Sequence, residues 1–451
     1  MKWARTIVVL AIAGVCVLGI RALSRNETVA TTGRAPLVAA DAIDAERLSE
    51  VIIEREGRRE RYEQREGGWW QVEPIRHPVD GWSIRQLATR VLKTESVRSL
   101  GTAEAVLRDA GLSPPAGRIE FRERGDDGAA GRVLVVELGK RSLAGRAYAR
   151  PAGGDAAVID GTLHDIVLER DPREFRRRDI FPDLAAIDEA VFASGPNSVR
   201  LVREGRAYRL EAPVRTRADR VQSEEFVDAL KRAKSAGFVT DAPSDLAIYG
   251  LAPASATVEV RVGSATQRLL IGDPVSIGAQ DRFGMVEGTP SVVRVPATAL
   301  ATIIPRYERL IDATATAVRA QDVGAIDIDA SAGYLALRRG TDGWTAEVGA
   351  RGSSDVRRGR VSKEAVERLL AALTTARAGS VQVAAFPLER AVATVVLRGF
   401  AGEALDTVRV AREQPEGGSV RTLLENGDGV LRVHGEIDLP LSATELEFGG
   451  G

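Results

Sequence analysis

The sequence predicts an α+β fold of three tandem repeats, each an antiparallel sheet with one long and one short helix, after an N-terminal membrane segment. Three observations lead to this prediction. A run of uncharged, mostly apolar residues lies near the start of the chain. A set of three alternating strands with polar or Gly-containing turns begins at Ser49 and recurs at Asp188 and Gly324. An amphipathic helix follows each strand set, so the repeats are predicted to be tandem domains.

The N-terminal run suits either a membrane anchor or a cleavable signal peptide. Lys2 and Arg5 precede the fifteen uncharged residues of segment 6–20, and Arg21 ends it. Fifteen helical residues extend about 22 Å, short of the roughly 30 Å hydrocarbon core, so spanning requires the flanking arginines to snorkel. An anchor predicts a single-pass inner-membrane protein with its C-terminal body in the periplasm. Cleavage near Ala22-Leu23-Ser24 instead predicts a protein secreted to the periplasm.

The predicted domain boundaries follow from these segments. A linker is expected after the apolar run because Thr and Ala are frequent there and Gly33 and Pro36 interrupt it. The third repeat is expected to diverge from the other two. The expected divisions are a membrane anchor or signal at 1–24, a linker at 25–43, and repeat units at 44–182, 183–318 and 319–451.

Two adjacent tryptophans mark the third strand of the first repeat, in "REGGWWQVEP". Trp69 and Trp70 must point to opposite faces of an alternating strand. Tyr208 and Trp344 occupy the matching position in the second and third repeats. This recurrence favours packing over an aromatic platform for a ligand. One tryptophan is expected in the core and the other over the helix or a neighbouring unit.

The long helix of each repeat is predicted from its apolar spacing. The three stretches are "DGWSIRQLATRVLKTESVRSL" from Asp80, "ADRVQSEEFVDALKRAKSAGFV" from Ala218 and "GRVSKEAVERLLAALTTARAGSV" from Gly359. One face of the second helix is expected to hold Val221, Phe226, Ala229, Leu230 and Ala233. The expected N-terminal capping residues are Ser223 with Glu224 and Glu225, and Ser362 with Glu364.

Each helix is followed by a Pro-containing turn and further strands that form hairpins. The first two repeats then end in a short helix and a tail of arginines and acids, "LHDIVLERDPREFRRRDIF" and "LATIIPRYERLIDAT". Helices gathered on one side of an antiparallel sheet complete the predicted α+β arrangement.

Composition excludes several classes of function. The chain of 451 residues has a formal net charge of −1, which gives no electrostatic basis for binding nucleic acid or an acidic partner. Cys16 is the only cysteine, and the only histidines are His77, His164 and His434. A Cys/His zinc site is therefore excluded, and neither a cofactor nor a metal is predicted.

Motif searches give no catalytic constellation. "GWSIR" at Gly81 resembles a nucleophile elbow but lacks its final Gly, so a helix N-terminus is predicted instead. "GKRS" at Gly139 lacks the spacing of a phosphate loop and is placed in a hairpin. The histidines are placed in a loop, at a short helix and on a late strand, and are interpreted as surface or boundary residues. No catalytic, cofactor-binding or metal-binding residue is predicted.

Charged clusters are interpreted in structural terms. Asp327 and Asp329 share a strand face and are expected to pair with arginines of a neighbouring sheet. The acidic group 126–128 lacks EF-hand spacing. The densest charge is "RDPREFRRRDIF" at 170–181. It suits either a docking patch for an acidic partner or lipid headgroups, or a helix end or hinge whose arginines pair with Asp171, Glu174 and Asp179 across the boundary of the first two repeats. The second interpretation is favoured because acids and arginines are interleaved.

Several motifs resemble those of the bacterial family DUF4340, a domain of unknown function. They are "WWQVEP" and "DGWSIRQL" in the first repeat, and "YGLAP", "LLIGDP" and "RYERLID" in the second. "DAGLSPP" of the first repeat is the same Gly-Leu turn as "YGLAP". The resemblance covers most of residues 44–318, whereas "AAFPLER" in the third repeat lacks the Gly-Leu turn. It implies an envelope protein with one N-terminal membrane segment, associated in some cases with ABC-type transport or gliding motility, and no known catalytic residues.

We therefore expect a non-enzymatic scaffold or accessory subunit of a membrane complex, with a protein partner in the inner membrane. The alternative is a periplasmic binding module for a cell-envelope polymer or small ligand lodged between repeats. Carboxylates and aromatics gathered in one cleft between repeats would favour the binding module. An exposed apolar patch or an open strand edge would favour the scaffold.

Overall fold

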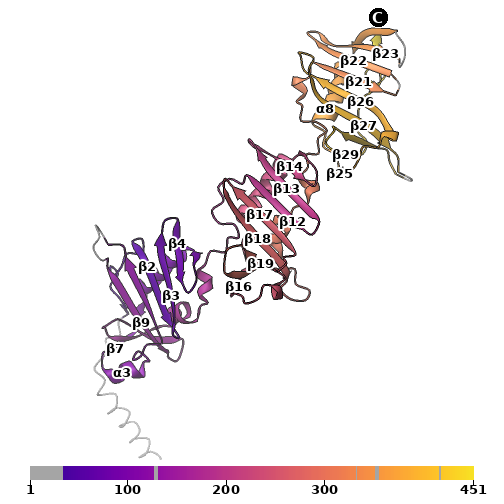
Figure 1. Cartoon of the computed structure of the whole chain (residues 1–451). Helices are drawn as coiled ribbons and strands as arrows, with labels where there is room; N and C mark the ends of the chain where they lie inside the picture. The colour runs from indigo at the N-terminus through magenta and orange to yellow at the C-terminus, as the bar shows by residue number, and fades with distance from the viewer. Residues whose placement is uncertain (1–33, 126–130, 332, 351–354, 416–417, 451) are drawn as a thin grey trace, which may run out of the picture. The chain divides into compact units, whose positions relative to one another are not determined.

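The computed structural model describes residues 34–125, 131–331, 333–350, 355–415 and 418–450. The expected membrane segment at 1–24 and the acidic group at 126–128 lie outside these residues. Over the described ranges, no helix is both long enough and apolar enough to span a bilayer. The chain divides into two compact units, and the boundary lies between Arg178 and Asp179. The first unit holds one large sheet, and the second holds two (Figure 1).

The first repeat is a nine-stranded sheet in the order β5-β4-β3-β2-β8-β9-β10-β11-β7. Its strands are β2 (Leu48–Arg55), β3 (Arg58–Arg65), β4 (Gly68–Glu73), β5 (His77–Val79), β7 (Arg98–Gly101), β8 (Gly117–Glu123), β9 (Val133–Arg141), β10 (Arg146–Pro151) and β11 (Ala156–Asp160). Its helical segments are α2 (Gly81–Leu92), α3 (Glu104–Asp109), α4 (Thr162–His164), the π-helix η1 (Asp165–Glu169) and the 3₁₀ helix η2 (Pro172–Phe175).

The second repeat has nine strands in the order β15-β14-β13-β12-β17-β18-β19-β20-β16. They are β12 (Glu189–Ser194), β13 (Asn197–Glu204), β14 (Ala207–Ala212), β15 (Thr216–Arg217), β16 (Gly237–Asp241), β17 (Ala256–Val262), β18 (Ala265–Pro274), β19 (Arg282–Val286) and β20 (Ser291–Val295). Its helices are α5 (Arg220–Arg232), η3 (Ala247–Tyr249), α6 (Ala297–Ile303) and α7 (Tyr307–Leu310).

The third repeat has ten strands in the order β30-β24-β23-β22-β21-β26-β27-β28-β29-β25. They are β21 (Ala325–Ala330), β22 (Gly333–Gly340), β23 (Gly343–Gly349), β24 (Val356–Val361), β25 (Ser380–Val383), β26 (Ala391–Arg398), β27 (Ala404–Glu413), β28 (Arg421–Glu425), β29 (Val430–His434) and β30 (Gly449–Gly450). Its helices are α8 (Lys363–Thr374) and η5 (Leu388–Arg390), and η4 (Ala320–Asp322) precedes it.

The three sheets share one strand order, so the predicted three repeats of an antiparallel sheet are confirmed. In each, two four-stranded meanders pair through their first strands, as β2 pairs with β8. The strand after the long helix then crosses to the far edge and pairs with the last strand. The third repeat, expected to diverge, keeps this order and adds β30 outside β24.

The repeats also share their core positions. Ile119, Val258 and Val395 lie at the same place in the three central strands, and all three are fully buried. The long helices bury the fourth, seventh, eighth and eleventh residues after the N-cap. These residues are Ile84, Leu87, Ala88 and Val91 in α2, Ser223, Phe226, Val227 and Leu230 in α5, and Val366, Leu369, Leu370 and Leu373 in α8.

Two expectations about α5 are wrong. Asp219, not Ser223, is its N-cap and accepts a hydrogen bond from the Gln222 amide at 2.9 Å. Ser223 is buried within the helix and donates its hydroxyl hydrogen to the Asp219 carbonyl. Val221 is exposed because it falls outside the buried stripe. By contrast, Ser362 caps α8 as predicted, accepting from the Ala365 amide.

A closing segment returns to the N-cap of the long helix in every repeat. The amides of Asp80, Asp219 and Ser362 donate to the carbonyls of Phe175, Leu310 and Leu446, at 2.9, 2.7 and 3.1 Å. Phe175 and Leu310 each follow the last strand of their meander by fifteen residues, and Leu446 follows by only twelve. The closing helices predicted for the first two repeats are present. The short helix expected in the third is absent from described residues 435–450, where the segment forms turns before β30.

Part of the expected linker at 25–43 is folded onto the first repeat. β1 (Ala35–Pro36) pairs with β6 (Glu95–Ser96) in a small two-stranded sheet. The side chains of Leu37, Val38 and Ile43 are buried in the first core. Sequence composition missed this because the apolar residues are too few to form a periodic pattern.

Candidate functional site

The tryptophans that stand out in the sequence have packing roles. Trp69 is buried in the first core beside Gly81, and Trp344 is buried at the equivalent place in the third. Trp70 points to the other face and carries the Arg76 guanidinium 5.0 Å from its ring centroid. The expectation that one tryptophan is in the core is confirmed. The second is half-buried and packs against Arg76.

Two of the three histidines are buried, contrary to the surface or boundary interpretation. His164 ends α4, where Nε2 donates to the Gly139 carbonyl at 2.9 Å. His434 ends β29, and its Nε2 has no hydrogen-bond partner among the described residues. Burial lowers the pKa of both imidazoles below the usual value, which favours their neutral form. His77, expected in a loop, begins β5.

Asp327 is paired, but within its own sheet rather than with a neighbouring one. Its carboxylate accepts from Arg338 on β22 at 2.7 Å and from Arg398 on β26 at 2.6 Å. Burial alone would raise the pKa of Asp327, but the two arginines outweigh it and lower the pKa. In the described part of the chain, no cluster of three or more acidic, His or Cys side chains could hold a metal ion.

The arginine-rich segment at 170–181 is engaged locally. Arg170 pairs with Glu174 at 2.9 Å and Arg173 with Asp171 at 2.7 Å. Arg176 is buried and donates to the Gln71 side chain at 2.8 Å. Asp171 and Glu174 therefore pair with arginines as expected, but with arginines of the same segment and not across the boundary between repeats. Asp179 pairs with Lys234 of the second repeat's helix region at 3.8 Å.

The two motif-like stretches occupy their predicted places. "GWSIR" is the first turn of α2, where Asp80 accepts from the amides of Trp82 and Ser83. "GKRS" lies at the end of β9, in the hairpin with β10.

The fold assembles a buried polar cluster where the second and third repeats meet, and no sequence motif marks it. Arg432, in the middle of β29, is fully buried. Its guanidinium contacts the Asp428 carboxylate at 2.7 Å and donates to the Asp312 carbonyl at 3.0 Å. Asp428 also accepts from the Thr216 hydroxyl of β15 at 2.5 Å. Arg432, Asp428, Asp312, Thr216 and Arg217 are called the junction cluster below.

Two further contacts join the second and third repeats. Arg377, which follows α8, pairs with the N-cap Asp219 of α5. Val430 of β29 is buried in the core of the second repeat. An arginine within the apolar strand "VLRVH" is the one sequence signal that could have located the cluster.

Two cavities flank the linker between these repeats. One, of 650 Å³, is lined by Asp219, Arg377 and the linker residues around Thr316. The other, of 450 Å³, is lined by Arg217, Asp406 and Asn426. The Nε and one terminal nitrogen of Arg217 are buried without a hydrogen-bond partner in the described structure, and burial lowers the pKa of this guanidinium. Aromatic side chains are missing from the described linings of both cavities.

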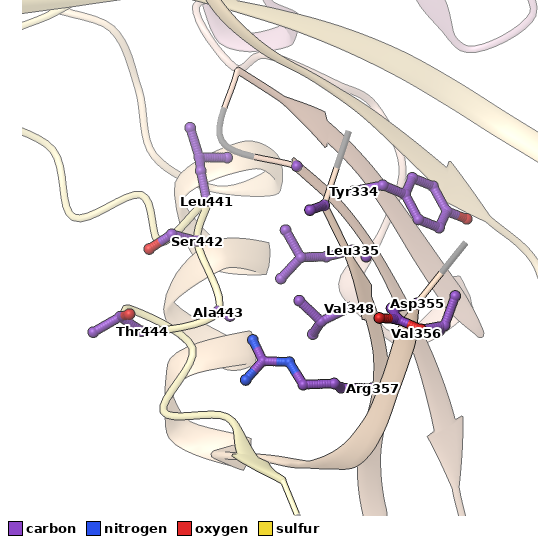
Figure 2. A pocket seen from close by; sticks show the side chains of 13 residues that line it. Tyr334, Leu335, Val348, Asp355, Val356, Arg357, Leu441, Ser442, Ala443 and Thr444 are labelled. Atoms are coloured by element: carbon purple, nitrogen blue, oxygen red, sulfur yellow. The ribbon is translucent and has the colours of Figure 1, made fainter. Parts of the chain in front are cut away.

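A third cavity of 660 Å³ is a groove within the third repeat (Figure 2). One wall is the row Leu335, Val348 and Arg357, which lie directly opposite one another on β22, β23 and β24. The other wall is segment 441–444 of the closing segment. Figure 2 shows the side chains of Leu335, Val348 and Arg357 pointing toward that segment, while Tyr334 points away.

A family of known sequences matches the middle of the chain. Residues 209–381 match the family DUF4340, a domain of unknown function. This confirms the resemblance to that family, but not its expected extent: the match leaves out the motifs of the first repeat and continues into the third repeat, where the resemblance was expected to be weaker. The matched region begins in β14 of the second repeat and ends in β25 of the third, so it includes the linker and both long helices beside the junction. No curated protein and no solved structure matches the chain.

Proposed function

We infer that the protein is a non-enzymatic scaffold or accessory subunit of a membrane complex, such as an ABC-type transporter or a gliding-type assembly. One observation carries this proposal. Each repeat exposes a large aliphatic side chain at the same hairpin tip, the turn between the second and third strands of the second meander. The residues are Leu143, Ile277 and Val420, which are 88%, 106% and 45% exposed.

The exposed aliphatic side chain recurs at the same hairpin turn in all three repeats. Single exposed apolar side chains are common on soluble proteins and need no explanation. The same exposure at the same turn of three repeats is a regular feature of the surface, and apolar surface of this kind is buried when a partner binds. The N-terminal segment would hold the body at the inner membrane, with the repeats in the periplasm.

The ionisable side chains that the fold brings together support a structural role. Arg432, Asp428 and Asp327 are each engaged by partners from neighbouring strands or from the adjoining repeat. A general acid or base must instead reach a substrate with its proton-accepting atom. In our proposal these groups therefore stabilise the fold and do not take part in catalysis.

The test is crosslinking and gentle solubilisation of the full-length protein from native membranes, with identification of the copurifying proteins. Stoichiometric recovery with the same membrane proteins is expected for the unaltered chain. The triple variant Leu143→Ser, Ile277→Ser and Val420→Ser should lose them. Leu388→Ser removes an aliphatic side chain that is 71% exposed at another site and should keep them. Recovery of the unaltered protein alone would refute a stable-subunit role.

A binding module for a small envelope ligand is the second candidate. The observation in its favour is the 450 Å³ cavity, whose lining includes Arg217, Asp406 and Asn426. Thermal-shift screening of the whole chain against envelope glycans and anionic metabolites tests it. A genuine ligand should raise the melting temperature of the unaltered protein and not that of Arg217→Met.

A further inference from the structure

The turn between β28 and β29 holds an asparagine followed by glycine. It reads "NGDG" at 426–429, and the chain's other two asparagines, Asn26 and Asn197, precede glutamate and serine. Gly427 is exposed, has a φ of +87°, and leaves open space where a side chain would lie. Its backbone nitrogen is therefore not shielded from the side-chain amide of Asn426, its neighbour in the chain.

The Asn426 side chain is held by two charged groups. Its Nδ2 donates to the Asp406 carboxylate at 3.2 Å, and its Oδ1 accepts from the Arg432 guanidinium at 3.4 Å. This orientation is the one that chemistry requires, because a carboxylate only accepts hydrogen bonds and a guanidinium only donates them. Arg432 is fully buried, so its positive charge acts on the amide oxygen with little screening by solvent.

The surroundings of Asn426 also give access to solvent. Asn426 and Asp406 line the 450 Å³ cavity beside the linker. The Gly427 amide makes no hydrogen bond to the described residues, so it can lose its proton to water. A nucleophilic nitrogen, a polarised carbonyl and a route for water and ammonia are thus present at one turn.

These groups are what the cyclisation of asparagine requires. The Gly427 nitrogen, after losing its proton to water, attacks the side-chain carbonyl carbon of Asn426 and forms a C–N bond. Nδ2 then takes up a proton and leaves as ammonia, which closes a five-membered succinimide ring. Water adds to either ring carbonyl and breaks its bond to nitrogen, giving aspartate or isoaspartate. The net reaction consumes one water and releases one ammonia.

Arg432 is placed to assist the attack. Negative charge develops on Oδ1 of Asn426 when the nitrogen adds, and the guanidinium already donates to that oxygen. A donor preorganised at an oxygen that gains charge lowers the barrier, as an oxyanion hole does in acyl transfer. An asparagine in an unfolded chain has no such donor. The geometry therefore favours a faster reaction in the folded chain than in the unfolded one.

Asn426 also links two parts of the contact between the second and third repeats. Asp406, which binds its Nδ2, accepts from the Thr316 hydroxyl of the linker at 2.5 Å. Arg432, which binds its Oδ1, belongs to the junction cluster. A carboxylate at position 426 cannot donate to Asp406 and repels it, because two like charges would lie within hydrogen-bonding distance. Conversion of Asn426 therefore separates the linker from the junction cluster.

We propose that Asn426 is a site of spontaneous deamidation, and that its conversion to aspartate or isoaspartate loosens the junction between the second and third repeats. The folded chain promotes the reaction through Arg432. The junction of an aged molecule is then weaker than that of a newly made one. This inference does not rest on the proposed scaffold role, since it concerns contacts within one chain.

The test incubates the full-length protein at mildly alkaline pH and follows the peptide that contains Asn426 by mass spectrometry. The same chain unfolded in urea is the reference. The folded chain should convert about tenfold faster or more, because the unfolded chain lacks the donor to Oδ1. Asn197, exposed but followed by serine, is the internal control and should stay unconverted. Asn426→Gln should abolish the conversion, since a glutamine would have to close a larger ring.

The consequence for the junction is measured with Asn426→Asp, which copies the product. Hydrogen exchange in β15 and β29 should become about tenfold faster or more, the change expected when a hydrogen bond to a charged group is lost. Asn197→Asp makes the same substitution at an exposed position of the second repeat and should leave exchange unchanged.

Three results would overturn the proposal. Conversion that is equally fast or slower in the folded chain would show that the hydrogen bonds of Asn426 protect it and that Arg432 does not assist. Unchanged exchange in Asn426→Asp would show that the junction does not depend on this amide. Exchange that rises evenly throughout the second unit would mean that the substitution weakens the whole unit and not the junction.

Discussion

The long helices of the first and second repeats begin with the same residue in the same place, but the two caps have different neighbours. Asp80 caps α2, is exposed, and accepts only from the start of its own helix. Asp219 caps α5 in the same way, is buried, and also pairs with Arg377 from the third repeat. The repeats are therefore alike in their cores and differ at their ends, where a shared position has acquired an additional contact.

Buried charge shows the same division. The first repeat satisfies Arg55 with Glu60 and with the carbonyls of its own closing segment. The second and third repeats satisfy Arg432 with groups from both of them. Charge in the first repeat holds one repeat closed, whereas charge at the junction cluster holds two repeats together.

The largest expected effect is in the first repeat. Arg55→Ala should lower its free energy of unfolding by about 3–5 kcal/mol, because it leaves the Glu60 carboxylate buried without its cation. Ala330 and Leu335 occupy the positions of Arg55 and Glu60 in the third repeat. The double variant Arg55→Ala with Glu60→Leu, which copies them, should lose much less free energy of unfolding. Urea unfolding followed by hydrogen exchange resolved by repeat measures both. Equal losses in the single and double variants would mean that the ion pair itself, and not the unpaired Glu60 carboxylate, accounts for the lost stability.

Next in size is the junction. Arg432→Ala should destabilise the second unit by about 3 kcal/mol or more, since it leaves Asp428 and the Asp312 carbonyl without their donor. Faster hydrogen exchange should appear in both β29 and β15, while the first repeat stays unchanged. Exchange that rises in the third repeat alone would show that the cluster does not couple the two repeats.

The two caps give a direct comparison of intermediate size. Asp80→Ala should cost about 1 kcal/mol, the usual value for losing an N-cap side chain. Asp219→Ala should lower the free energy of unfolding by about 2 kcal/mol, because the ion pair with Arg377 is lost as well as the cap. The ion pair accounts for only part of this loss, since the Arg377 side chain is largely exposed. Measuring both in the full chain, with Ser362→Ala as a third cap, tests the difference. Equal losses at Asp80 and Asp219 would remove Arg377 from the explanation.

The smallest effect is a dependence on pH. Burial lowers the folded-state pKa of His164 in the first unit and of His434 in the second. Below about pH 6.5 the unfolded chain binds protons that the folded chain does not, so stability falls as the pH decreases toward the folded pKa values. The loss is at most about 1.4 kcal/mol per pH unit for each histidine. Urea unfolding at pH 7.5 and 5.5 measures it.

Single variants assign this dependence to each unit. His164→Gln should flatten the pH dependence of the first unit only, and His434→Gln that of the second. His77→Gln, at a partly exposed position, should change neither. An unaltered slope in His434→Gln would show that this imidazole has the same pKa in the folded and unfolded states.

Much of the fold could be predicted from periodicity. The strand and helix patterns, the equivalence of Trp69, Tyr208 and Trp344, and the cap at Ser362 follow from spacings of two and of about 3.6 residues, which local sequence displays. The cap at Asp219 was missed because Ser223 lies four residues further on and is also a good capping residue type. The buried histidines were misplaced because burial depends on which strands and closing segments cover a position.

The sequence by itself determined that three similar sheets follow one another and that each carries a long helix on one face, because those features depend on neighbours a few residues apart. Only the tertiary structure decided how the ends of the repeats are used. Arg432 meets the Asp312 carbonyl across more than a hundred residues, and Arg377 meets the N-cap Asp219 of the preceding repeat. Such contacts between distant residues leave no periodic trace in the chain, since they arise only when separate sheets and closing segments pack together.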